Sequence, residues 1–263
     1  MRVRAAILAA AVTVLATAAP GASAQTGITG IEASSTGLIS DEGFVTLGTT
    51  LECPVATGGA TVSATLEQQH SGGTSSAFAF GGRDVLDSFC DPGGSPMALA
   101  FGSSDPPFTR GPADVSMEGC AGGGCLSTEQ TVQLRDGGRT VDASVPAGSQ
   151  SLSQFGVSSR AVLESSGVVT LGTVVDCSSV SGPSFSGTLE QGKGKKLAEA
   201  TTSAFILGGC GGSGPVALSF TPNAGSPAFD PRHARLSLTV CAGPAGDFDC
   251  ATVDTRLKLI SAG

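Results

Sequence analysis

The sequence predicts an all-β protein made of two tandem β-sandwich modules, each with two disulfides, behind an N-terminal signal peptide. Three observations carry this prediction: an apolar leader, short runs of alternating polarity, and a long segment that occurs twice. Gly, Ser, Thr and Val are abundant among the 263 residues, and Trp and Tyr are absent. Such a composition favours strands and turns over helices.

The first 24 residues have the layout of a secretory signal. Residues 1–4 contain two arginines, residues 5–19 are apolar, and Ala22-Ser23-Ala24 suits signal peptidase. We therefore expect a signal peptide over residues 1–24 and a mature chain that begins at Gln25. No later run is apolar and long enough to span a bilayer, so we expect no transmembrane anchor in the mature chain.

The charge of the chain limits its partners. The full sequence has a formal net charge of -8, and the leader contains Arg2 and Arg4 but no acid. Cleavage would therefore remove two positive charges and leave an acidic protein, which argues against nucleic acid as the partner.

Two stretches of the chain are copies of each other. Gly43–Thr49 recurs as Gly167–Thr173, and Thr65–Gln68 recurs as Thr188–Gln191. Further matches, in the same order, are Cys53 with Cys177, Ser76–Phe78 with Ser203–Phe205, Ala98–Phe101 with Ala217–Phe220, and Cys120 with Cys241. The repeat predicts a first module over residues 25–135, a linker over 136–150 and a second module over 151–263.

Within each copy, apolar residues alternate with polar ones. Val45 and Leu47 alternate with Thr46 and Gly48, and similar runs contain Val62, Ala64 and Leu66, or Leu236, Leu238 and Val240. A period of two indicates strands with one buried face. About seven such strands per copy, separated by Gly, Pro and Asp, are typical of an immunoglobulin-like sandwich. The expected core aromatics are Phe78, Phe80, Phe101, Phe205 and Phe220.

The eight cysteines all follow the expected cleavage site, and each copy has four. An even number in an exported chain indicates disulfides, and four cysteines allow three pairings per copy. Two close pairs flank glycine-rich turns, which favours one pairing in each copy. The predicted disulfides are Cys53–Cys90, Cys120–Cys125, Cys177–Cys210 and Cys241–Cys250.

Each copy resembles a family of uncharacterised exported domains of actinobacteria. The shared elements are the Gly43–Leu47 strand that leads to Cys53, the Leu66-Glu67-Gln68 strand, and Cys90 before a short apolar strand. The resemblance implies an immunoglobulin-like fold outside the cytoplasm, and it implies no activity. The chain also has a more distant similarity to the enediyne-binding apoproteins, which are small secreted sandwiches with a short hairpin disulfide.

The residues offer no catalytic, cofactor-binding or metal-binding constellation. His70 and His233 occupy different places in the two copies, and we expect both to be surface residues. The spacing of Cys120 and Cys125 resembles that of zinc ligands, but export favours a disulfide. Asp247 with Asp249 is a weak calcium candidate, Glu67 with Glu190 a weak carboxylate pair, and Gly211–Gly214 is expected to be a flexible turn.

One basic cluster stands out in this acidic chain. Lys193, Lys195 and Lys196 are expected at the tip of a hairpin, where they could contact an anionic surface such as a cell-wall polymer. The sequence therefore predicts a non-catalytic protein, secreted or associated with the cell wall, with a binding, adhesive or structural role. The alternative is an extracellular small-molecule carrier or an enzyme inhibitor.

Overall fold

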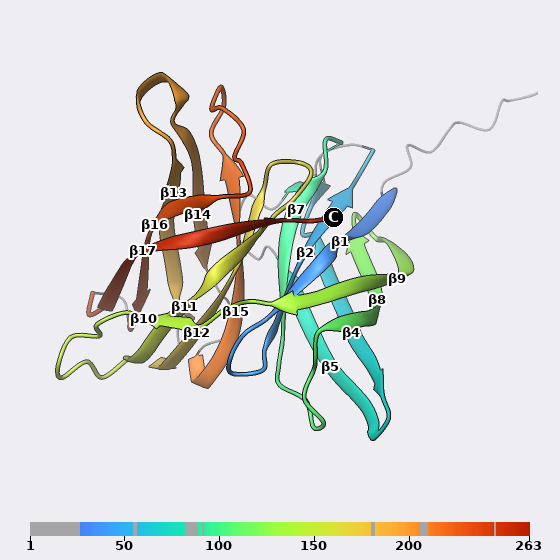
Figure 1. The fold of residues 1–263 in the computed structure, drawn as a ribbon, viewed down its shortest axis with the longest axis horizontal. Helices are drawn as coiled ribbons and strands as arrows, with labels where there is room; N and C mark the ends of the chain where they lie inside the picture. The colour runs from blue at the N-terminus through green and yellow to red at the C-terminus, as the bar shows by residue number, and fades with distance from the viewer. Residues whose placement is uncertain are drawn as a thin grey trace, which may run out of the picture.

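Two β-sheets that lie side by side make up the computed structural model of the protein (Figure 1). The structure describes residues 27–54, 57–82, 89–90, 92–179, 182–205, 210–244 and 246–263. The expected signal peptide and Gln25 lie outside the described residues. Within these ranges the only helical segment is one turn of 3-10 helix, η1 (Gly194–Lys196).

The first sheet is built from residues 30–136. Its strands are β1 (Gly30–Ile39), β2 (Val45–Glu52), β4 (Thr61–His70), β5 (Gly73–Gly82), β7 (Ser95–Phe101), β8 (Gly111–Ala121) and β9 (Gly124–Asp136). They follow one another in the order β5-β4-β8-β9-β1-β2-β7. Two short strands, β3 (Thr57–Gly58) and β6 (Phe89–Cys90), pair separately.

Strand β1 changes its partner along its length. It runs antiparallel to β2 from Gly30 to Ile39, with an irregularity between Ala33 and Gly37. From Thr36 to Ile39 it also runs parallel to β9. The first half of β1 therefore has a paired strand on one side only among the described residues.

The second sheet is built from residues 140–261. Its strands are β10 (Thr140–Asp142), β11 (Leu152–Leu163), β12 (Val169–Ser179), β13 (Ser184–Gln191), β14 (Ala198–Phe205), β15 (Cys210–Pro222), β16 (His233–Ala242) and β17 (Asp249–Ser261). Strand β11 pairs with β12 and also runs parallel to β17, so seven strands form a ring, with β10 attached to β11. Read from β14, the ring repeats the strand order of the first sheet: β14-β13-β16-β17-β11-β12-β15.

Each sheet encloses its own hydrophobic core, because the alternating side chains of its strands point inward. The first core includes Val62, Ala64 and Leu66, and the second includes Leu236 and Leu238, as the period of two predicts. The two clusters share no residue.

The expected core aromatics divide into two groups. Phe101 and Phe220 are fully buried, which confirms their prediction. Phe78 is 63% exposed and Phe205 is 37% exposed, so those two predictions are wrong. The reason is strand alternation: in β5 it is Ala79 that points into the core, so its neighbour points out. The side chain of Phe80 lies outside the described part.

Three disulfides occur among the described side chains. They join Cys53 to Cys90, Cys120 to Cys125, and Cys241 to Cys250, which agrees with the prediction. Cys177 is also disulfide-bonded, but the side chain of Cys210 lies outside the described part. Each of the described pairs joins two cysteines of the same copy.

Two segments expected to be irregular contain strands. Within the expected linker, residues 136–150, Thr140–Asp142 form β10 on the edge of β11. Gly211–Gly214, expected to be a flexible turn, lies inside β15 and pairs with β12. The hydrogen bonds between strands are made by the backbone and need no side chains. A glycine-rich segment can therefore extend a strand when the neighbouring strand offers its backbone N–H and C=O groups.

The glutamine of Thr-Leu-Glu-Gln makes the same loop contacts in both copies. Gln68 accepts a hydrogen bond from the Thr109 N–H (2.8 Å) and donates to the carbonyls of Thr109 (2.9 Å) and Pro112 (3.1 Å). Gln191 bonds Asp230 in the same way, accepting from its N–H (2.6 Å) and donating to its carbonyl (3.0 Å). This residue therefore ties the end of a central strand to the loop that enters the next one.

Replacing Gln68 by alanine should lower the free energy of unfolding by about 2–3 kcal/mol, because it removes three hydrogen bonds that a buried side chain makes to the loop, each contributing about 1 kcal/mol. Gln69→Ala is the matched control, since Gln69 is exposed on the opposite face of the same strand. Urea unfolding of both variants measures the difference. Equal stability of the two variants would show that the buried amide does not hold the loop.

No helix in the described part of the chain is long and apolar enough to cross a membrane.

Candidate functional site

The two sheets pack through corresponding strands. Strand β7 lies against β15, β2 against β12, and β1 against β11, and each of these pairs consists of equivalent strands of the two copies. Such reciprocal contacts are characteristic of an isologous interface, in which the same surface of two subunits meets itself. The two copies therefore contact each other along several strands, although the sequence predicts a linker between them.

Glycine and threonine on β2 and β12 make this close packing possible. A Cβ atom at Gly172 would collide with Oγ1 of Thr46, and one at Gly48 would lie 2.7 Å from Oγ1 of Thr170. Thr46 and Thr170 point away from their own cores but are only 7% and 1% exposed. These strands are consequently buried on both faces, not on one as their alternation suggests.

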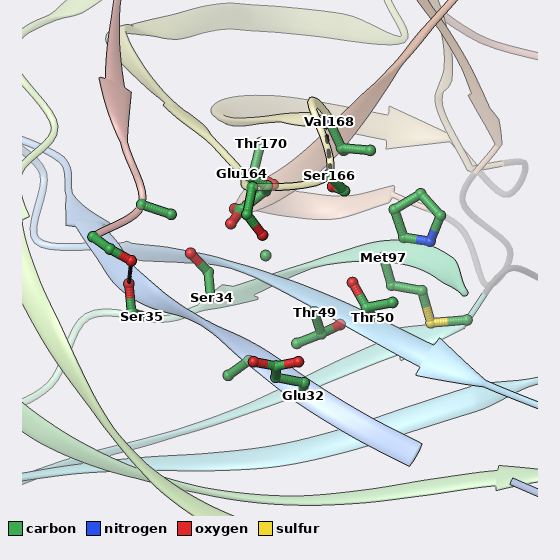
Figure 2. A pocket seen from close by; sticks show the side chains of 16 residues that line it. Glu32, Ser34, Ser35, Thr49, Thr50, Met97, Glu164, Ser166, Val168 and Thr170 are labelled. Carbon is green, nitrogen blue, oxygen red and sulfur yellow. Dashed lines mark hydrogen bonds between the residues drawn. The ribbon is translucent and has the colours of Figure 1, made fainter. Parts of the chain in front are cut away.

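A pocket of about 140 Å³ lies beside this contact, between β1, β2 and the turn that joins β11 to β12 (Figure 2). Two side-chain carboxyl groups, from Glu32 and Glu164, line it together with a large share of hydroxyl groups. The lining hydroxyls belong to Ser34, Ser35, Thr49, Thr50, Ser165, Ser166 and Thr170. None of the lining residues is aromatic, basic or a cysteine, so the pocket suits a ligand that donates hydrogen bonds or is positively charged.

One hydroxyl group in this pocket has no hydrogen-bond partner among the described residues, and one carboxyl group has a raised pKa. The Thr49 hydroxyl is buried and has no hydrogen-bond partner among the described residues. The carboxylate of Glu164 accepts a long hydrogen bond from the Thr170 hydroxyl (3.3 Å). Burial raises the pKa of Glu164 above its ordinary value, and hydrogen bonds from Ser34 and Thr170 oppose that shift.

The raised pKa of Glu164 predicts a pH-dependent cost to stability. A carboxyl with a higher pKa in the folded than in the unfolded protein stabilises fully below its unfolded pKa, and that contribution is lost as pH rises through the folded pKa. The Glu164→Gln side chain cannot ionise, so the stability of this variant should not fall as the pH rises through the pKa of Glu164. In thermal unfolding between pH 4 and pH 8, the variant should therefore gain stability relative to wild type as the pH rises.

The control for this experiment is Glu67→Gln, because Glu67 is an exposed residue outside the pocket, whereas Glu32 is the other carboxylate within it. A stability of Glu164→Gln that stays constant or falls relative to wild type as the pH rises would contradict the assignment.

A second pocket continues along β1. Gly30, Ile31 and Glu32 of β1 line it together with Thr50, Glu52 and Gln130. Within it, the side-chain oxygen of Gln130 accepts a hydrogen bond from the backbone N–H of Ala33 (2.6 Å). The two pockets together follow the half of β1 that has a paired strand on one side only.

The basic cluster lies in the connection between β13 and β14, the hairpin tip that the sequence predicts. Lys193 and Lys196 are exposed, and the side chain of Lys195 lies outside the described part. Contact of these lysines with an anionic surface stays a prediction.

His70 has a partner that the sequence did not suggest. Its Nε2 lies 2.6 Å from the hydroxyl of Ser75, which donates to the carbonyl of Pro106 (2.8 Å). Ser75 is fully buried, so its hydroxyl cannot reach a substrate from solvent. The pair therefore fixes the β4–β5 hairpin against the loop before β8. The other histidine, His233, is exposed in β16.

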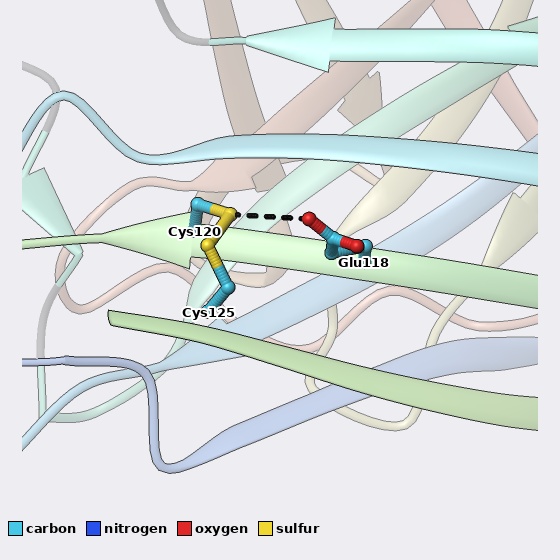
Figure 3. Close-up of side chains that lie close together, drawn as sticks. All are labelled: Glu118, Cys120 and Cys125. Atoms are coloured by element: carbon cyan, nitrogen blue, oxygen red, sulfur yellow. Dashed lines mark hydrogen bonds between the residues drawn. A yellow bond between two sulfur atoms is a disulfide. The ribbon is translucent and has the colours of Figure 1, made fainter. Parts of the chain in front are cut away.

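The metal candidates are occupied in other ways. Asp249 accepts hydrogen bonds from the N–H groups of Gln150 and Ser151, both at 2.7 Å. Among the described residues, one group of possible ligands comes together, Glu118 with Cys120 and Cys125 (Figure 3). Both sulfur atoms of that group form a disulfide, which leaves no thiolate to bind a metal.

The two repeated glutamates do not form a carboxylate pair. Glu67 lies on β4 and Glu190 on β13, in different sheets, and neither lines the pocket between the sheets. The carboxylates that do share a pocket, Glu32 and Glu164, were missed by the sequence reasoning. One feature of the sequence pointed to this region: a glycine, Gly48 or Gly172, occurs at the same outward-facing strand position in both copies. A glycine at such a position indicates that another part of the protein packs closely against it.

No family model matches the sequence, and no curated protein matches it. Its function must therefore be argued from the fold and the pocket.

Proposed function

We propose that the chain is an exported, non-catalytic binding protein built from two tandem immunoglobulin-like modules. The observation that carries the proposal is the pocket between the sheets, to which both copies contribute hydrogen-bonding groups. Its lining holds hydroxyls and carboxylates but no histidine or cysteine. This chemistry suits recognition of a polar or cationic partner better than nucleophilic catalysis.

The strand order supports the immunoglobulin-like assignment. Strands β1, β2 and β7 correspond to one layer of that sandwich, and β4, β8 and β9 to the other, with β1 bridging the two layers. The same order recurs in the ring of β11–β17. The resemblance of each copy to uncharacterised exported domains of actinobacteria points the same way.

Export is supported by the cysteines and by the leader. Disulfides persist mainly in oxidising compartments, and no free cysteine occurs among the described residues. Intact mass and N-terminal sequencing of the protein from a culture should give Gln25 as the first residue. A mature chain that retains Met1 or the apolar leader would contradict export.

Fractionation of the producing culture, with identification of proteins that co-purify from each fraction, tests the binding role. We expect the protein in the cell wall or the medium, in complex with an extracellular partner. The alternative, a small-molecule carrier like the enediyne-binding apoproteins, gains no support from a polar pocket of about 140 Å³ without aromatic residues.

A further inference from the structure

The short strand β10 shows how the edge of a module accepts an extra strand. Thr140, Val141 and Asp142 pair antiparallel with Ser158, Val157 and Gly156 of β11. The pairing continues beyond both ends of β10. The Ser159 N–H donates to the Arg139 carbonyl (2.9 Å), and the Ala143 N–H donates to the Phe155 carbonyl (2.8 Å).

The equivalent place in the first copy lies beside β1. The Gly137 N–H donates to the Ile39 carbonyl (2.7 Å), just after the parallel pair β1–β9 ends. The Ala262 N–H donates to the Leu163 carbonyl (2.9 Å), just after the parallel pair β11–β17 ends, so the two copies correspond at this point. By this correspondence, a strand equivalent to β10 would lie opposite Glu32, Ala33 and Ser34. The described part of the chain places no strand there.

A side chain stands in for the missing strand. The Ala33 N–H, which faces the open edge, is bonded to Gln130. The register of β8 with β9 and of β16 with β17 makes Thr255 the equivalent of Gln130 in the second copy. A threonine is too short for that reach, and there β10 occupies the edge. Gln130 can be displaced by side-chain rotation alone, so the edge can be opened without unfolding.

We propose that the open edge of β1 binds an extended, basic peptide segment of another protein as an additional antiparallel strand. The proposal deepens the binding role proposed above and rests on it. Main-chain hydrogen bonds supply affinity in such strand addition, and alternate side chains supply specificity.

Charge at the open edge determines which peptide fits. Asp142 of β10 lies opposite Gly156, where a Cβ atom would be 3.0 Å from its carboxylate. The equivalent of Gly156 on β1 is Glu32, so a lysine is favoured at this position and an aspartate is disfavoured. No basic residue lines either pocket to neutralise the three glutamates there, Glu32, Glu52 and Glu164.

Two further positions of the peptide follow from β10. The Thr140 N–H and hydroxyl both bond to Asp41, which lies in the β1–β2 turn of the other copy. In the open site the residue equivalent to Asp41 is Ser165, which follows Glu164, and its hydroxyl can accept a hydrogen bond from a serine of the peptide. Val141 and Ala143 pack against the second core, and their equivalents would pack beside Ile31 and Ala33.

A second copy of this chain is a poorer occupant than a basic partner. Its own Arg139–Ala143 segment is held by Asp41 and β11, and would have to be released. Two copies that each carry a formal net charge of -8 also repel each other.

The test uses the full chain and a labelled peptide, acetyl-Gly-Arg-Ser-Val-Lys-Ala-amide, in fluorescence anisotropy. We expect saturable binding that weakens at least tenfold when the valine nitrogen is methylated, because that N–H faces β1. Methylation of the lysine nitrogen, which faces away, should change the affinity less than twofold.

Four variants of the protein sharpen the test, two of them controls. Glu32→Lys should weaken binding at least tenfold, and a peptide with aspartate in place of lysine should restore it; Glu67→Lys, which lies outside the pockets, should leave binding unchanged. Gln130→Ala frees the Ala33 N–H and should strengthen binding several-fold. Glu129→Ala, at the neighbouring position on β9, is its control.

Absence of saturable binding, equal effects of the two methylations, or failure of the charge exchange would each overturn the proposal. So would a dimer in sedimentation that the peptide does not dissociate, because a second copy would then occupy the edge. Retention of the protein in the cytoplasm would instead contradict the export role, and it would not alter the peptide affinity.

Discussion

Replacement of both Cys53 and Cys90 by alanine should lower the free energy of unfolding by about 4 kcal/mol. The disulfide spans 37 residues, and a cross-link over a loop of that length restricts the unfolded chain by about this amount. Both residues are also at most 2% exposed, so their loss leaves part of the first core unfilled. Guanidinium unfolding monitored by circular dichroism gives the change.

The hairpin disulfide is the matched comparison. Cys120–Cys125 spans 5 residues and Cys125 is exposed, so replacing this pair by alanine should cost about 2 kcal/mol. Equal losses from the two double variants, or no loss from the first, would show that loop length does not govern the contribution of these cross-links.

Separating the two copies should give fragments that fold but associate with themselves. Residues 25–138 and 139–263 each contain a complete core, so each fragment should show β-type circular dichroism and a cooperative melt. Each would also expose its threonine and glycine surface, which already packs against its counterpart in the full chain. Sedimentation at tens of micromolar should therefore give about twice the fragment mass, whereas the full chain should be a monomer.

Gly48→Lys in the first fragment is the control for this experiment, since a long cation on the packing face should give a folded monomer. A fragment that is unfolded alone would mean that the copies depend on each other to fold. A second fragment that begins at residue 151 should melt at a lower temperature than one that begins at 139, because it lacks β10, whose Val141 packs against the core.

Much of the local structure could be predicted because strands leave a local signature. The alternation in Val62–Leu66 or Leu236–Val240 reports which side chains share a face, and the structure buries those residues. The two hairpin disulfides were also predictable, since the strand pairing places Cys120 beside Cys125 and Cys241 beside Cys250. Phe78 and Phe205 were mispredicted because large size was given more weight than the phase of the alternation.

The candidate site could not be found in the same way. Its carboxylates, Glu32 and Glu164, are 132 positions apart in the numbering and meet only because β1 lies beside the β11–β12 turn. Nothing local distinguishes them from glutamates at exposed strand ends. The recurrence of Gly48 as Gly172 was visible, but its meaning depended on the contact of both glycines with threonines of the opposite copy.

The sequence by itself determined that the chain is rich in strands, that it contains two copies of one pattern, and which residues of most strands face a core. These properties depend on the spacing of side chains along the chain, and so residues close together in the sequence are enough to predict them. Only the tertiary structure decided that β2 and β12 are buried on both faces, that a polar pocket forms between the copies, and that β10 covers one edge while the equivalent edge of β1 stays open. Those features depend on how two folded surfaces fit together, and a period of two along one strand carries no information about what packs against its second face.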